Sequence, residues 1–122
     1  MTVLGKLTTD LDWVRCKNDI WCPLFNVDLS RVNTFGVYII WHTGSPAKVV
    51  RLGQGYVADR LEKHRNDKEV TGYGMYGSLM VTWAAVSPSI VDGVERYLAE
   101  KWKPLVGMRF PDVPVVPVNS PF

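Results

Sequence analysis

The run Phe35–His42 constrains the fold most, because its sequence FGVYIIWH is rich in the β-branched and aromatic residues typical of a strand. The residues Thr-Gly-Ser-Pro at positions 43–46 form a turn cluster directly after it. The run Lys48–Gly53 then returns with two valines and a leucine. These features predict a β-hairpin over residues 35–53.

A helix is predicted directly after the hairpin. The Gln-Gly pair at positions 54 and 55 is expected to end the second strand, and the helix is expected over Tyr56–Asn66. Its apolar side is marked by three residues at i, i+4 and i+7, which are Val57, Leu61 and His64.

A glycine-rich loop over residues 71–77 leads into a third apolar run, Leu79–Val86, which predicts a third strand. Ser87 is a candidate N-cap and Pro88 a candidate first residue of a second helix that runs to about Trp102. The core-facing residues of that helix are expected to be Val91, Val94, Leu98 and Trp102.

The order strand, strand, helix, strand, helix predicts an α+β domain with a small three-stranded antiparallel sheet flanked by helices. Residues 1–34 show no clear pattern beyond a few apolar anchors, and we expect them to pack on the domain as an N-terminal extension. Residues 35–122 would form the domain itself, ending in a proline-spaced tail from Pro104.

Size and composition are those of one folded domain, since the chain has 122 residues, of which 47% are hydrophobic and 21% charged. The longest apolar runs are far too short to span a bilayer, and the N-terminus lacks the pattern of a signal peptide. We therefore expect a cytoplasmic protein without membrane contact. In that compartment Cys16 and Cys22 are expected to be reduced thiols that pack in the interior.

The formal net charge of +2 permits nucleic-acid binding without requiring it. The hairpin and the first helix carry a basic set that would contact phosphates if it lined a groove. The members of this candidate nucleic-acid-binding set are Lys48, Arg51, Arg60, Lys63 and Arg65.

Glu95 is the residue that helical geometry singles out, because it lies four positions after Val91 and three before Leu98, beside the apolar stripe. A carboxylate buried there needs an arginine partner or a metal ion. Arg60 and His64 stand one turn apart on the first helix, where they can face a phosphate or mark the wet edge of an ordinary amphipathic helix.

The order of these residues resembles the GIY-YIG nuclease superfamily. The resemblance rests on Gly36-Val37-Tyr38, then Arg51-Leu52-Gly53, then Arg60, His64 and Glu95, and it covers residues 35 to about 107. Each motif is short, but all five arrive in the family's order on the expected strands and helices.

The resemblance implies a phosphodiesterase that uses one Mg²⁺ or Mn²⁺ ion and acts on nucleic acid, most simply DNA. Tyr38 would help to deprotonate the attacking water, and Arg60 would stabilise charge on the phosphate. Glu95 would bind the metal ion, and His64 matches a histidine that many members carry one turn after the arginine. Since so short a chain carries no recognisable second DNA-reading domain, specificity would come from the N-terminal residues, a partner protein or a homo-oligomer.

Two positions depart from the family pattern. Arg51 stands where the family usually has a tyrosine, so Tyr38 is expected to act as the base alone while Arg51 contributes positive charge. The family's late asparagine has no counterpart near Gly107, which leaves Asn119 as the candidate distal element.

Two other functions stay open at this point. A non-catalytic nucleic-acid-binding module would keep the fold without turnover. A protein-interaction module would use the aromatic residues Tyr73 and Tyr76 and the proline-spaced tail, and a buried ion pair between Glu95 and Arg60 without a cleft would favour it.

Overall fold

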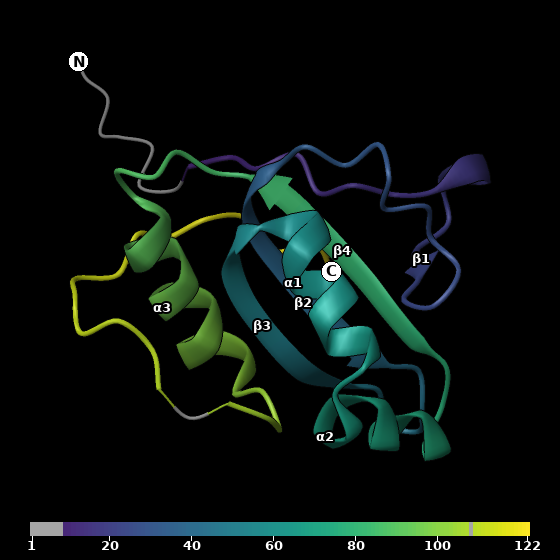
Figure 1. The fold of residues 1–122 in the computed structure, drawn as a ribbon. Helices are drawn as coiled ribbons and strands as arrows, with labels where there is room; N and C mark the ends of the chain where they lie inside the picture. Colours follow the sequence, from purple (N-terminus) through teal and green to yellow (C-terminus); the bar gives the residue numbers. More distant parts are fainter. Residues whose placement is uncertain (1–8, 108) are drawn as a thin grey trace.

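A four-stranded antiparallel sheet forms the centre of the molecule (Figure 1), as seen in a computed structural model that describes residues 9–107 and 109–122. The strands are β1 (Cys22–Pro23), β2 (Phe35–His42), β3 (Lys48–Tyr56) and β4 (Leu79–Ala85), in the spatial order β1-β4-β2-β3. The α+β class and the hairpin of β2 and β3 are confirmed. The prediction of three strands is wrong, because Cys22 and Pro23 pair with Val81 and Met80 and add a short edge strand.

Three α-helices accompany the sheet, namely α1 (Val57–Arg65), α2 (Lys68–Thr71) and α3 (Val91–Trp102). Short 3-10 turns lie at Lys17–Asp19 and Gly72–Met75, so part of the segment expected as a glycine-rich loop is helical. None of the helices in the described part of the chain is long and apolar enough to cross a membrane.

Two predicted boundaries are wrong. Gln54 and Gly55 do not end the strand, since both pair with β2 and the strand continues to Tyr56. Helix α3 begins at Val91, three residues later than predicted, because the residues from Ser87 first form a turn. The Ser87 carbonyl accepts hydrogen bonds from the amides of both Ile90 and Val91, at 3.1 Å each.

The two faces of the sheet carry separate apolar layers. Alternate residues of β2 point to opposite faces, so that Val37 and Ile39 pack with α3 while Tyr38 and Ile40 pack with α1. The predicted apolar faces of both helices are confirmed, with Trp102 only partly buried. Because α1 and α3 lie on opposite faces, the outer edge of β3 is the place where residues from both helices can meet (Figure 1).

Residues 9–34 of the expected N-terminal extension pack against the sheet, while residues 1–8 lie outside the described residues. Leu24 is fully buried beside α1, and the Arg65 guanidinium donates hydrogen bonds to the Leu24 and Val27 carbonyls at 2.8 and 2.5 Å. This segment therefore completes the apolar layer under α1.

The expectation of free thiols at Cys16 and Cys22 is wrong, because the two residues form a disulfide. A tight turn brings them together, since the Cys16 amide donates to the Ile20 carbonyl at 2.7 Å and the Asp19 amide donates to the Cys16 carbonyl at 3.1 Å. The resulting separation of their Cα atoms is 5.2 Å, which lies in the range that a disulfide spans.

Replacing Leu24 by alanine tests whether the N-terminal segment is part of the core. Because this side chain is fully buried, Leu24→Ala should lower the free energy of unfolding by about 2–5 kcal/mol. The neighbouring Phe25 is 53% exposed, so Phe25→Ala should change it far less. Urea unfolding followed by circular dichroism measures both, and equal small effects would show that the segment folds apart from the sheet.

Candidate active site

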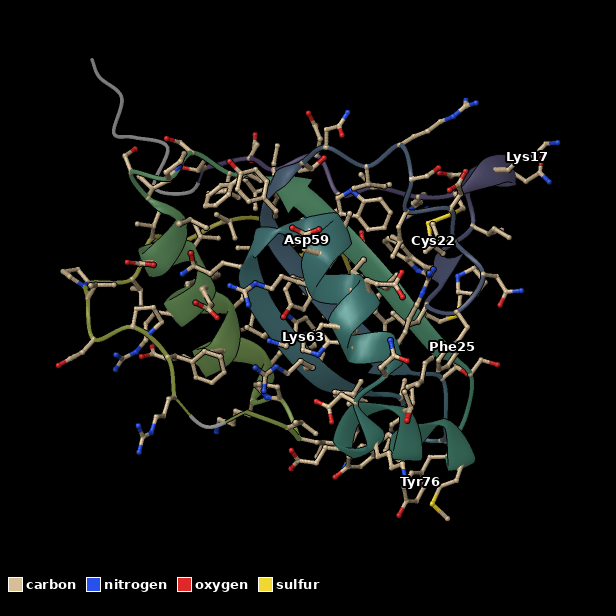
Figure 2. All side chains as sticks on the ribbon, in the orientation of Figure 1. Lys17, Cys22, Phe25, Asp59, Lys63 and Tyr76 are labelled. Atoms are coloured by element: carbon tan, nitrogen blue, oxygen red, sulfur yellow. A yellow bond between two sulfur atoms is a disulfide. The ribbon has the colours of Figure 1, made fainter. Side chains whose placement is uncertain are left out.

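A cavity of about 330 Å³ opens at the edge of β3, between α1 and α3. In Figure 2, Lys63 lies on the side of α1 that faces α3 in this view. Residues from both helices, two strands and the start of α2 line the cavity, and we call it the edge pocket. They are Tyr38, Arg51, Gly53, Gln54, Arg60, Lys63, His64, Asp67 and Glu95.

A hydrogen bond between Tyr38 and His64 lies at the base of the edge pocket. The Tyr38 Oη and His64 Nε2 are 2.6 Å apart, and both side chains are buried. Gly53 pairs with Tyr38 across the hairpin, and a Cβ there would lie 2.5 Å from the Tyr38 hydroxyl. The glycine therefore leaves the room that the phenol needs to reach the edge of the sheet.

Burial keeps both members of this pair neutral. It lowers the pKa of His64 to about 4, with the positive charge of Arg51 adding to the effect. It also raises the pKa of Tyr38, although Arg51 and Arg60 oppose the rise. At neutral pH the imidazole is thus uncharged, and in the tautomer with hydrogen on Nδ1 its Nε2 accepts a hydrogen bond from the Tyr38 hydroxyl.

Arg51 reaches the edge pocket from β3 beside an irregularity in the strand. It pairs with Ile40, directly before the pairing register shifts. Gly107, with φ +92°, lies against its guanidinium, where a Cβ would be 2.5 Å from Nη1. Its Nε is buried and has no hydrogen-bond partner among the described residues, while the residue as a whole lines the pocket.

The Arg60 side chain reaches the edge pocket from α1 and packs against a second glycine. Gly55 has φ +127°, a conformation that favours glycine, and a Cβ there would lie 2.8 Å from the Arg60 Nε. Arg60 and Arg51 therefore line the same pocket from a helix and a strand, and each guanidinium packs against a glycine. Two guanidinium groups in this arrangement favour an anion such as phosphate.

Glu95 contributes the carboxylate of the edge pocket and is only 9% exposed. Its Oε1 accepts a hydrogen bond from the Gln54 amide at 2.9 Å, and the same amide nitrogen donates to Asp92 Oδ1 at 2.5 Å. Burial raises the pKa of Glu95, while the hydrogen bond from Gln54 opposes the rise. In the described part of the chain Glu95 forms no ion pair with an arginine, so the structural ion pair considered from the sequence is not found.

The structure brings together six of the predicted residues and leaves three elsewhere. The six are Tyr38, Arg51, Arg60, Lys63, His64 and Glu95. Lys48 lines a different cavity, and Arg65 uses its guanidinium to bind the N-terminal segment. The Asn119 side chain exchanges hydrogen bonds with the Leu11 backbone, which ties the C-terminal tail to the N-terminal segment.

Sequence reasoning missed Gln54 and Asp92. The sequence predicts Gln54 only as part of a strand break, although the glycines on both sides of it are a sign of a close approach to the strand. Asp92 lies three residues before Glu95, so it shares a side of α3 with it and could have been found from helical spacing.

The donor atoms of the edge pocket fit a hard divalent cation bound mostly through water and phosphate. Within residues 9–107 and 109–122 there is no group of three or more His, Cys, Asp or Glu residues placed to hold a metal ion. Glu95 offers a carboxylate at the pocket wall, with the Asp92 carboxylate beside it. Magnesium keeps several water ligands and is usually bound through one or two carboxylates, so Glu95 and Asp92 are the residues that would hold it.

No protein-family model, curated protein sequence or solved structure matches this chain. The evidence for its function is therefore the geometry of the edge pocket.

The low pKa of His64 predicts how stability depends on pH. An unfolded histidine binds a proton near pH 6.5, whereas folded His64 does so only near pH 4. Its contribution to stability is thus complete above pH 6.5 and is lost as the pH falls towards 4, with a slope of at most ~1.4 kcal/mol per pH unit. His64→Gln should flatten the unfolding free energy in this window.

NMR titration provides the direct measurement. The chain has two histidines, so its spectrum contains two imidazole signals, and His64→Gln identifies one of them by its loss. The His64 signal should shift near pH 4. A midpoint near 6.5 would contradict the buried neutral pair.

Proposed function

We propose that this protein is a divalent-metal-dependent endonuclease of the GIY-YIG type that hydrolyses phosphodiester bonds in DNA. The observation that carries the proposal is the buried Tyr38–His64 hydrogen bond, held in one pocket with Arg51, Arg60 and Glu95. These groups supply a proton acceptor, positive charge for a phosphate and an oxygen ligand for a cation.

A phosphodiester would lie against Arg51 and Arg60, whose charges stabilise the negative charge that develops on its oxygens. The attacking water would transfer a proton to the Tyr38 oxygen while the phenol passes its own proton to His64 Nε2. The new P–O bond then forms as the bond to the leaving oxygen breaks, and that oxygen takes a proton from solvent. A cation bound at Glu95 would supply positive charge at the leaving oxygen.

This scheme makes Tyr38 and His64 a pair, in place of the expectation that Tyr38 acts alone. The raised pKa of Tyr38 means that the phenol carries its proton at neutral pH, so it needs an acceptor for that proton. His64 Nε2 lies 2.6 Å away and is neutral at the same pH.

The alternative functions explain less of the pocket. A non-catalytic nucleic-acid-binding module accounts for the arginines and Lys63, but gives no reason to bury a tyrosine against a histidine. A protein-interaction module would use Tyr73 and Tyr76, which pack around His42 away from the edge pocket. The absence of an ion pair between Glu95 and an arginine, in the described residues, also fails to support that reading.

Removing the charge of Glu95 tests the metal dependence. Glu95→Gln should abolish nicking of supercoiled plasmid across a Mn²⁺ titration while the circular dichroism spectrum stays unchanged, because the cation loses its main protein ligand. Glu100→Gln is the matched control, since Glu100 lies on the same helix but is exposed. Equal cleavage by Glu95→Gln and wild type would refute the assignment.

Changes at Arg51 and Tyr38 separate charge from proton transfer. Arg51→Ala should slow single-turnover cleavage roughly a hundredfold, the usual scale for one charge-stabilising donor, and Arg51→Lys should recover part of the rate. Tyr38→Phe should slow it at every pH, because the phenylalanine cannot relay a proton. Arg31→Ala, an exposed arginine outside the edge pocket, is the control. Normal cleavage by both Arg51→Ala and Tyr38→Phe would leave the pocket without a catalytic role.

A further inference from the structure

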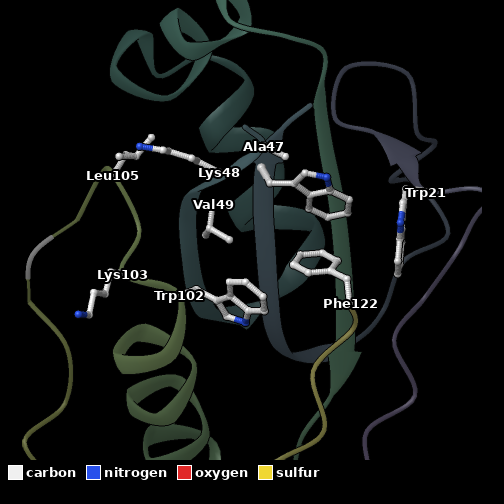
Figure 3. Close-up of a pocket in the computed structure, with 9 residues that line it drawn as sticks. Trp21, Ala47, Lys48, Val49, Trp102, Lys103, Leu105 and Phe122 are labelled. Atoms are coloured by element: carbon white, nitrogen blue, oxygen red, sulfur yellow. The ribbon is translucent and has the colours of Figure 1, made fainter. Parts of the chain in front are cut away.

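A second and larger cavity, of about 590 Å³, lies on the α3 side of the sheet (Figure 3). Its walls include three tryptophans and a phenylalanine from four separate parts of the chain, with two lysines among the other lining residues. We call it the aromatic cleft and define it by Trp21, Trp41, Trp102, Phe122, Lys48 and Lys103.

The rings of the aromatic cleft meet edge to face. Phe122 lies 4.9, 5.1 and 5.9 Å from the ring centroids of Trp41, Trp102 and Trp21, with interplanar angles between 65° and 88°. It is nevertheless 47% exposed, because the cavity beside it is open. Aromatic side chains therefore line an open cavity large enough for a small organic group.

Two lysines line one side of the aromatic cleft (Figure 3). They are the charged residues among its lining, and Figure 3 shows the Lys48 side chain extending away from the rings towards Leu105. Outside the lining, the Arg15 guanidinium lies 4.3 Å from the Trp21 ring centroid. A cationic guest is thus disfavoured, whereas a flat ring joined to negative charge is complementary to both the rings and the lysines. A nucleobase with its phosphates has that chemistry.

The chain after α3 connects the cleft to the edge pocket. Leu105 lines the cleft, and its amide donates to the Val49 carbonyl at 3.1 Å. Two residues later, Gly107 lies against the Arg51 guanidinium in the edge pocket. Along β3, Lys48 and Arg51 are three residues apart, which is about 10 Å at most. A nucleic-acid strand with a phosphate at Arg51 is therefore within reach of the cleft.

We infer that the aromatic cleft binds an unpaired base of single-stranded DNA, with the neighbouring phosphates on Lys48 and Lys103. The bound base must be unpaired, because a base in a duplex has to be unpaired and unstacked before it can enter the cleft, and this costs free energy. Binding of the single strand depends only on the cleft. Delivery of that strand to the edge pocket rests on the proposed nuclease function.

Tryptophan fluorescence measures this binding directly, because three of the five tryptophans line the cleft. The probes are a twelve-residue oligothymidylate, an abasic oligomer with the same number of phosphates, and thymidine monophosphate, all in EDTA. The oligothymidylate should quench the fluorescence and bind at least tenfold more tightly than either of the others, with an affinity that falls as salt rises. Equal binding of the abasic oligomer would overturn the inference, and so would equal binding of the mononucleotide.

Two variants test the position of the site. Phe122→Ala should weaken oligothymidylate binding about tenfold, the scale of one base–aromatic stack. Lys103→Glu removes positive charge at the rim without touching the ring cluster, so it keeps the test valid if Phe122→Ala does not fold. The controls are Tyr76→Ala and Arg31→Glu, an exposed aromatic and an exposed cation outside the cleft. Equal losses in test and control variants would overturn the assignment.

The failures of the two proposals are distinguishable. Glu95→Gln should abolish cleavage and leave fluorescence quenching by oligothymidylate unchanged. If oligothymidylate quenches the fluorescence of the wild-type protein but the protein cleaves no DNA, the cleft inference is supported and the nuclease proposal fails. If wild type cleaves duplex plasmid but the oligomer causes no quenching, the nuclease proposal stands and the cleft inference fails.

Discussion

The buried hydrogen bond between Tyr38 and His64 is the interaction around which the pocket is organised. It joins the central strand β2 to α1 through a contact of 2.6 Å inside the apolar layer that these elements share. Because both groups are buried and neutral, the contact costs less than a buried charge would. The same burial would make the proposed proton transfer between them sensitive to any charge that enters the pocket.

The backbone around this pair supplies space where side chains would block it. Gly53 leaves room for the Tyr38 hydroxyl, and Gly55 leaves room for Arg60. Gly107 likewise leaves room for Arg51. The preceding residue, Val106, fixes this segment on the edge of β3, because its amide donates a hydrogen bond to the Val50 carbonyl. Charged groups from a helix and from the edge strand can therefore approach one small volume, although each stands on a separate element.

Several features were predictable because they depend on local pattern. The β-branched and aromatic run of β2 and the apolar spacing of α1 and α3 fixed the type of each element and the burial of Leu61 and Leu98. Glu95 was singled out by helical spacing alone. The strand β1 was not predictable, since two residues carry no periodicity and pair only because β4 presents a free edge.

The sequence by itself determined which residues carry charge and which faces of the helices are apolar, because both follow from composition and period. Only the tertiary structure decided which of these residues share a site. Arg60 and Arg65 lie five residues apart on one helix, yet one lines the edge pocket and the other binds backbone carbonyls of the N-terminal segment. That difference depends on which segment packs beside each side chain, and a contact between residues 41 positions apart has no signature in local spacing.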